Sequence, residues 1–242
     1  MENANPNLLS SNSFRNNKSL SKAIMIFVAF VILLDIIAVF SGLMEISLVS
    51  QAKEGVQISQ TAADGNDARQ GIIGIFQMVL TLVFFILFLV WVNRSNKNLA
   101  PLGVSYKQFS SGWAVGWFFV PIANIYKPYR VVSEIWDSCS SIRVSVNGVN
   151  FTQKTPGGIV GLWWGMWLLS NFAGQLAFRL TMRAGTMNTI YAASVVSVIS
   201  DITSIISEFA SAYLVYKITS LQIEKHNSLQ TSEQPEGIPN AN

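Results

Sequence analysis

Four runs of hydrophobic residues, at about 22–49, 72–93, 157–180 and 190–217, constrain this chain more than any other feature of its sequence. A helix needs roughly 20 consecutive apolar residues to cross a bilayer, and each run is long enough. Half of the 242 residues are hydrophobic and only 12% are charged, whereas soluble domains carry about a quarter charged residues. The pattern predicts an all-α, polytopic membrane helical bundle with four transmembrane helices.

The runs differ in their polar content and in their small residues. The first is too long for the apolar core of a signal peptide, which has roughly 7–15 residues, so we expect an uncleaved span. The second run is the most uniform, and Gln77 is its only strongly polar side chain between Ile72 and Val92. Gly157, Gly161 and Gly165 stand four apart in the third run, a spacing that lets membrane helices approach closely. We expect this glycine row to pack against a neighbouring helix.

Polar sequence separates and flanks these runs. Residues 1–21 and 220–242 are rich in polar residues such as Asn and Ser and lack an apolar pattern, which predicts disordered cytoplasmic tails. The membrane domain is expected to cover residues 22–219. Polar connections are expected at 50–71, 93–111 and 142–156.

The stretch 112–141 does not have the character of a full span. Trp113 to Tyr126 offers only about 14 apolar-leaning residues where a span needs roughly 20, and Pro121 interrupts it. Non-helical backbone at membrane depth needs cover from protein or a water-filled cavity, so we expect a short re-entrant or interfacial segment. From Pro128 onward, apolar and polar residues alternate at helical spacing, which predicts an in-plane amphipathic helix. Its apolar side is Val131, Val132, Ile135, Trp136 and Cys139, and its polar side is Arg130, Ser133, Glu134, Asp137 and Ser141.

The basic residues distinguish two topologies, because cytoplasmic flanks of spans collect Lys and Arg. If residues 112–141 stay on the inner side of four spans, 12 of the 16 basic residues lie inside. If residues 112–126 cross instead, the split becomes 8 to 8. The asymmetry predicts a multi-pass protein of the cell membrane with both termini in the cytoplasm. All seven tryptophans then lie toward the cytoplasmic half, as an aromatic layer at the inner face.

One ordered set of residues resembles a known family. It comprises Trp113, Trp117, Pro121, Asn124, Pro128, Glu134 and Trp136, followed by GLWWGMWLLSN at 161–171. Trp91, Arg94, Asn98, Leu99, Leu102 and Gly103 resemble the entry to the same domain. This spacing resembles the bacterial integral membrane family of unknown function DUF4328, over roughly residues 75–215. The resemblance implies a multi-span bacterial membrane protein and implies no activity.

Four carboxyl side chains, Asp35, Glu45, Asp201 and Glu208, fall inside the predicted spans. A charged side chain at mid-bilayer costs at least about 2.5–3.5 kcal/mol. At a rise of about 1.5 Å per residue, Asp35 and Asp201 lie at similar depths in separate helices. Asp201 and Glu208 also share one serine-rich face of the fourth span, which must face protein or water.

Two interpretations of these acids remain open. In the first, Asp35, Asp201 and Glu208, assisted by Asn171 or Gln175 of the third span, form a cation or proton path. In the second, Asp35 and Asp201 are neutral and bonded to serines that hold the bundle together, since burial favours the uncharged form of a carboxyl group. Intramembrane proteolysis also requires two aspartates, but the glycine-flanked aspartate motif of such proteases is absent.

Composition narrows the function classes further. Cys139 is the only cysteine and His226 the only histidine, which removes multi-His metal sites and most His-dependent catalysis. The basic residues form no face of the kind that nucleic-acid binding needs. We therefore expect no enzyme, no cofactor, no metal and no nucleic-acid partner. Glu45 is expected to pair with Arg179 or Arg183 near the outer edge.

Two functions follow as hypotheses. The first is a non-enzymatic scaffold or accessory protein. In addition to the lipid bilayer around it, it binds anionic lipid or a membrane-protein partner at its inner face. Its candidate contacts are Trp113, Trp117, Asn124, Lys127, Arg130, Glu134 and Trp136. Glu134 could instead pair with Arg130 one helical turn away. The alternative is a small cation- or proton-coupled transporter or channel that uses the mid-membrane carboxyl groups.

Overall fold

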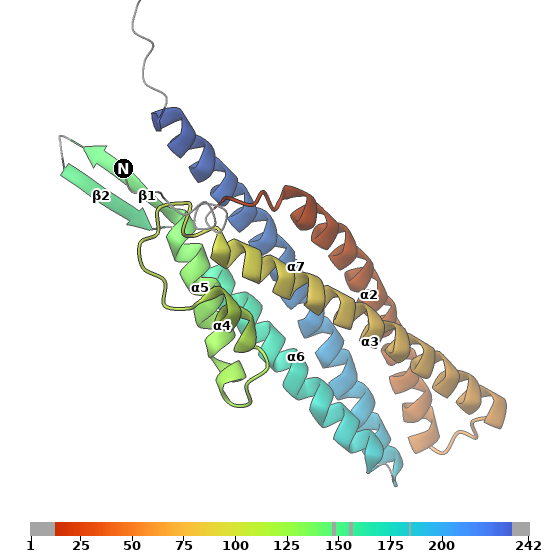
Figure 1. Cartoon of the computed structure of the whole chain (residues 1–242). Helices are drawn as coiled ribbons and strands as arrows, with labels where there is room; N and C mark the ends of the chain where they lie inside the picture. Colours follow the sequence, from red (N-terminus) through yellow and green to blue (C-terminus); the bar gives the residue numbers. More distant parts are fainter. Residues whose placement is uncertain (1–12, 147–148, 155–156, 184, 234–242) are drawn as a thin grey trace, which may run out of the picture. The chain divides into compact units, whose positions relative to one another are not determined.

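The computed structural model describes residues 13–146, 149–154, 157–183 and 185–233 (Figure 1). Its elements in chain order are α2 (Lys18–Lys53), α3 (Gln60–Lys97), α4 (Ser111–Gly116), the 3-10 helix η1 (Ala123–Ile125), α5 (Lys127–Ser140), β1 (Ser141–Val146), β2 (Val149–Lys154), α6 (Gly158–Met182) and α7 (Met187–Glu233). The chain divides into two compact units. Unit 1 comprises residues 1–22, 89–157 and 215–242, and unit 2 comprises residues 23–88 and 158–214.

The starts of α2, α3 and α7 are each set by a polar residue that accepts a hydrogen bond from the first turn. Asn16 Oδ1 accepts from the N–H of Lys18 at 2.9 Å, where α2 begins. Ser59 and Thr186 do the same before α3 and α7. Short polar side chains satisfy the otherwise unpaired N–H groups of a first turn. These starting points are therefore encoded locally.

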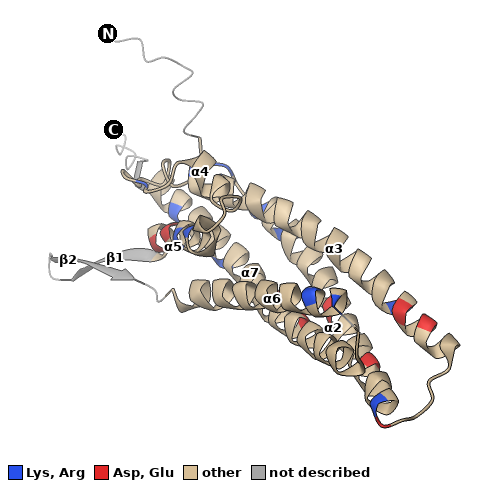
Figure 2. Cartoon of the chain, turned by 90° about the horizontal axis from the view of Figure 1, so that it is seen from below, with Lys and Arg blue, Asp and Glu red and all other residues tan. Residues whose placement is uncertain are grey.

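Three of the described helices, α2, α3 and α7, are long and apolar enough to cross a membrane. Figure 2 shows α3 as an unbroken uncharged stretch between the charged residues near its two ends. Large apolar side chains along these helices are exposed, among them Phe30, Phe76 and Phe209, and extensive exposed apolar surface of this kind marks contact with a membrane or with other protein. The predicted third span corresponds to the 25-residue α6, which is not among the three.

Helices α6 and α7 of unit 2 are joined by hydroxyl groups. Ser170 Oγ lies 2.5 Å from Ser204 Oγ, and Ser200 Oγ donates to the Ser170 carbonyl at 3.0 Å. Ser207 Oγ donates to the carbonyl of Trp163 at 3.3 Å. Hydrogen bonds of this kind hold helices together in lipid, where the hydrophobic effect between helices is absent.

The close helix approach in unit 2 occurs at Gly42 of α2, and not at the predicted glycine row. A Cβ atom at Gly42 would lie 2.5 Å from Cγ2 of Val198 on α7. At Gly161 and Gly165 a Cβ would meet no atom within 4 Å. A Cβ at Gly157 would lie 3.4 Å from Cδ1 of Trp136, so the predicted packing is met at Gly157 and not at Gly161 or Gly165.

Gly42→Ala is expected to destabilise the protein by about 1–3 kcal/mol, because the added methyl group overpacks the contact with Val198. Gly74→Ala is the matched control, since a Cβ there meets nothing within 4 Å and helix propensity alone should stabilise by about 0.5–1 kcal/mol. Thermal unfolding in detergent measures both variants. Shifts of the same sign in both would contradict the contact, and Val198→Ala should rescue Gly42→Ala.

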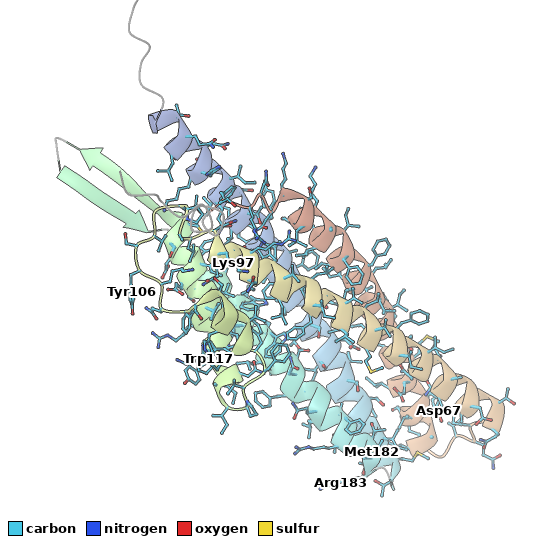
Figure 3. The ribbon with its side chains drawn as sticks, viewed as in Figure 1. Asp67, Lys97, Tyr106, Trp117, Met182 and Arg183 are labelled. Carbon is cyan, nitrogen blue, oxygen red and sulfur yellow. The ribbon has the colours of Figure 1, made fainter. Side chains whose placement is uncertain are left out.

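The predicted polar connection 50–71 is mostly helical, because α2 runs on to Lys53 and α3 begins at Gln60. Its polar side chains pair across the two helices: Gln70 Nε2 donates to Glu45 at 2.8 Å, and Arg69 Nε donates to Ser41 Oγ at 2.8 Å. The predicted partners of Glu45, Arg179 and Arg183, are replaced by Gln70 and Asn66. Figure 3 shows Arg183 at the C-terminal end of α6.

Both predicted tails are partly ordered in unit 1. Asn98 makes two hydrogen bonds to the backbone ahead of α2. Its Oδ1 accepts from the N–H of Arg15 at 2.9 Å, and its Nδ2 donates to the Arg15 carbonyl at 2.8 Å. At the other end, α7 continues to Glu233, and Gln222 Nε2 donates to the Ser95 carbonyl at 2.9 Å. Residues 18–21 and 220–233 are therefore helical, whereas residues 1–12 and 234–242 lie outside the described residues.

The predicted all-α class is confirmed for the main elements, and the connection after α5 adds a short hairpin to it. β1 and β2 form an antiparallel hairpin in which Ser141 is opposite Lys154 and Val146 is opposite Val149. The described part of the expected connection 142–156 is thus two-stranded, whereas residues 147–148 and 155–156 lie outside the described residues. Alternation of branched and polar residues at 141–146 is typical of a strand, and this signal was available in the sequence.

Candidate functional site: a carboxyl and amide cluster in unit 2

The strongest candidate site in the chain lies where α2, α3 and α7 each contribute a polar side chain to unit 2. Gln77 Nε2 on α3 donates to Asp35 Oδ1 at 2.9 Å and to Asp201 Oδ1 at 3.1 Å. Asp35 is only 4% exposed. One neutral amide therefore joins two carboxyl groups from separate helices, in the middle of apolar sequence.

Glu208 is the third acid of the cluster. It lies on α7 seven residues after Asp201, is 7% exposed, and interacts electrostatically with both Asp35 and Asp201. Its buried Oε2 has no hydrogen-bond donor among the described residues. A buried carboxyl oxygen without a donor is rare and requires an explanation, such as a bound proton or ion.

The cluster contains no compensating base in the part of unit 2 that the structure describes. The four Lys and Arg residues of this unit are engaged or exposed elsewhere: Arg69 donates to Ser41 and Asn66, Lys53 lies over the Tyr191 ring, and Arg179 and Arg183 are exposed. Asp35 and Asp201 therefore share one neutral donor, and no base among the described residues of unit 2 offsets the charge of the three acids. In the described residues, they do not form a group suited to a metal ion.

The structure corrects two expectations about this site. Asn171 of α6 is exposed, and its Nδ2 donates to the Trp167 carbonyl of its own helix at 2.8 Å, so it does not join the acids. The serines of α7 do not hold the aspartates either. Ser194 and Ser211, for example, donate to backbone carbonyls one turn earlier. Gln77 is the site residue that the sequence did not identify, although it is the polar exception in its apolar run.

The sequence of this chain also identifies its family. A family model described as "Domain of unknown function (DUF4328)" matches residues 54–220, well over half of the chain. The chain belongs to the DUF4328 family. Neither the curated proteins nor the solved structures contain a match to it. Of the cluster, Gln77, Asp201 and Glu208 lie within the matched range, and Asp35 on α2 precedes it.

The second candidate region of this DUF4328 protein is the segment from α4 to α5 in unit 1. The Lys127 ammonium group is enclosed by aromatic rings: Nζ lies 5.0 Å from the ring centroid of Trp117, 5.4 Å from that of Tyr126 and 5.6 Å from that of Phe109. Such cation–π contacts are stabilising. Lys127 therefore ties the segment together and does not extend freely toward a headgroup.

The other candidate contact residues of this segment differ in how far their side chains are exposed. The Trp113 ring packs against that of Trp117 at a tilt of 33°, with centroids 4.7 Å apart, and Trp113 remains exposed. Trp136 is 2% exposed, so its ring offers no surface to a partner. Asn124 is half-buried, and its Oδ1 has no donor among the described residues.

Arg130 and Glu134 do not form the expected pair with one another. Gln108 lies between them: its N–H donates to Glu134 Oε1, and its Oε1 accepts from Arg130 at 3.4 Å. Arg130 is exposed and Glu134 half-buried. The two side chains thus fix the connection between α3 and α4 onto α5, and only Arg130 remains accessible to an anionic group.

Cys139 of α5 is expected to resist alkylation at pH 8. Burial raises the pKa of its thiol to about 11, and only the thiolate reacts. Iodoacetamide should therefore modify it at least on the order of a hundredfold more slowly than an ordinary exposed cysteine. Asn227→Cys in a Cys139→Ser background is the exposed control. Equal rates at the two positions would show that the apolar side of α5 opens to solvent.

Proposed function

We propose that this DUF4328 protein carries protons, or monovalent cations, across the membrane through the cluster of Asp35, Gln77, Asp201 and Glu208. The observation that carries the proposal is the Gln77 amide that donates to both aspartates. A neutral amide satisfies hydrogen bonds but cannot offset charge. Three ionised carboxyl groups at this depth would each carry a cost of at least about 2.5–3.5 kcal/mol.

Positive charge taken up from solution removes that cost. A proton on one carboxylate forms an O–H group that a neighbouring carboxylate oxygen accepts, as in other carboxyl pairs that share one proton. Release of the proton restores the original carboxylate. The unpartnered Oε2 of Glu208 is the natural acceptor in such an exchange.

The donor pattern favours a proton over a larger cation. A bound cation requires several oxygen atoms that converge on it, whereas Gln77 directs N–H groups toward the two aspartates. Like the positive edge of any donor, these N–H groups repel a metal cation. A proton needs only one carboxyl oxygen, and carboxyl chains of this kind serve as proton relays in membrane proteins.

The proposal includes four spans, with α6 as the third, and both termini in the cytoplasm. It is supported by the 12 of 16 basic residues that this topology places inside. A single cysteine at Ser145 in a Cys139→Ser background tests it. A membrane-impermeant thiol reagent should label this position only after cells are opened. Labelling of intact cells would make residues 112–126 a full crossing and reverse the direction of α7.

Flux through purified protein tests the function itself. Liposomes that contain the protein and a trapped pH-sensitive dye are expected to dissipate an imposed pH gradient faster than protein-free liposomes. Parallel uptake of sodium or potassium ions separates proton from cation carriage. Wild-type liposomes that match protein-free liposomes for all three ions would overturn the proposal.

The second candidate function is a scaffold or accessory role at the inner face, through lipid or a protein partner. It is favoured by exposed apolar side chains in unit 1, among them Trp113, Phe119 and Ile125. Co-purification of lipid and protein with wild type and with a Trp113→Ala, Arg130→Ala variant tests this role. Both positions are exposed, so the double variant is expected to fold, and unchanged co-purification would count against a contact there.

A further inference from the structure

The reversal of the chain between α4 and α5, residues 117–126, is apolar and carries no charged residue. We call it the apolar turn. Ile122 at its tip is 81% exposed, and Phe119 and Ile125 are also exposed. Phe118 is buried beneath them. Exposed apolar side chains therefore concentrate on one short, outward reversal of unit 1.

The tip has an unusual backbone. Ile122 has φ 66° and ψ −52°, and the N–H of Ala123 donates to the Pro121 carbonyl at 2.7 Å. These values define a γ-turn with positive φ, which is rare and strained. A β-branched residue is the least suited to positive φ, where glycine carries no such strain. Ile122 thus carries two costs in water: its apolar side chain is exposed, and its backbone is strained. Backbone strain of this kind accompanies functional sites.

Most of the backbone of the apolar turn is already hydrogen-bonded within the segment. The N–H groups of Phe118, Phe119, Ala123, Asn124, Ile125 and Tyr126 each donate to a carbonyl between Val115 and Ala123. Unpaired backbone groups are what exclude irregular structure from lipid. Most N–H groups of the apolar turn are paired within the protein, as lipid requires, whereas a loop in water could pair them with solvent.

Positive charge follows the apolar residues directly. Lys127 lies among three aromatic rings at the base of the turn, and Arg130 is exposed one turn into α5. Apolar side chains followed by Lys, Arg and interfacial aromatics are typical of a segment that enters lipid and rests its base at the headgroups. Phosphate groups of anionic lipids complement Arg130.

We propose that the apolar turn is a lipid wedge: Phe119, Ile122 and Ile125 insert among the acyl chains of the membrane that α3 enters. The inference deepens the second candidate function, because it names lipid as what this surface binds, and it is independent of the carboxyl cluster. The γ-turn directs Ile122 outward from the body of unit 1. Lipid provides the apolar surroundings that this side chain lacks in water.

An environment-sensitive fluorophore at Ile122→Cys, in a Cys139→Ser background, tests insertion in lipid nanodiscs. Tyr106→Cys is the matched control, since Tyr106 is 79% exposed in the same unit and projects away from the helices (Figure 3). The probe at Ile122 is expected to show blue-shifted emission and at least about threefold stronger quenching by nitroxide-labelled acyl chains than the probe at Tyr106. A probe at Phe119→Cys should agree. Nanodiscs with and without anionic phosphatidylglycerol separate the contribution of Arg130 from apolar insertion, which is expected in both.

The outcomes separate lipid from other occupants. Purified nanodiscs contain no protein partner, so water-like emission at both Ile122 and Phe119 would overturn the lipid wedge. If wild type nevertheless co-purifies a protein that Trp113→Ala, Arg130→Ala loses, the surface binds that partner and the second candidate function stands without lipid. Insertion together with unchanged co-purification would support the wedge and reject a protein contact.

Discussion

Asp201→Asn is expected to reduce proton flux through liposomes to the level of protein-free liposomes while the protein remains folded. Asparagine keeps the size of aspartate and an oxygen that can accept from Gln77, which now lies 3.1 Å from the Asp201 oxygen. It cannot take up and release a proton. The variant therefore separates proton chemistry from packing, and dye-reported decay of a pH gradient measures it.

Glu45→Gln is the matched control for this variant. Glu45 is another acid within a predicted span, and it too accepts from amide side chains, Gln70 at 2.8 Å and Asn66 at 3.5 Å. It lies ten residues beyond Asp35 on α2, about 15 Å along the helix. Its replacement should leave flux unchanged. Wild-type flux in Asp201→Asn, or equal losses in both variants, would contradict a path through Asp35 and Asp201.

The sequence predicted helices long and apolar enough to cross a membrane, and a similar depth for two acids, for simple geometric reasons. Hydropathy over some 20 residues identifies a span because lipid thickness fixes the length of helix required, and α2, α3 and α7 follow those runs. A constant rise per residue converts sequence separation to depth. Depth measured from flanking basic residues placed Asp35 and Asp201 at one level, and the structure brings both to Gln77.

The partner of these acids was not predictable because it depends on the rotation of each helix about its axis. Hydropathy along 72–93 is nearly uniform, so the sequence contains no amphipathic face that would orient α3. Gln77, as the polar exception in that run, was the available signal. Asn171 is likewise a polar side chain within an apolar run, but it is exposed and bonded to its own helix. Packing between helices decides between two such residues, and a single sequence does not record it.

The ends of the helices depend on contacts between residues far apart in the chain. Asn98 fixes the backbone at Arg15 across 83 positions, and Gln222 reaches Ser95 across 127. Polar segments that resemble tails are ordered by such contacts and not by local propensity. The strained γ-turn is the opposite case: isoleucine disfavours positive φ, so local reasoning would never place Ile122 there.

Gln77→Leu is expected to lower the free energy of unfolding by about 2–6 kcal/mol, since two carboxyl oxygens each lose a donor worth about 1–3 kcal/mol. Unfolding by heat in detergent, with tryptophan fluorescence as the probe, measures the change. Gln70→Leu is the control from the same helix, because Gln70 makes one such bond and is only half-buried. A loss no larger than in Gln70→Leu would show that the amide does not hold the aspartates.

Replacement of Gln77 and its two aspartates by leucine then separates structure from function. In Gln77→Leu, Asp35→Leu, Asp201→Leu, the two carboxyl groups that lose their donor in Gln77→Leu are absent, and apolar replacement of buried polar groups is often neutral or stabilising. Stability should therefore return toward that of wild type while flux stays absent. If the acids only held the bundle together, the wild-type cluster would give no flux to lose. Recovery of stability without recovery of flux is the result that a purely structural cluster cannot produce.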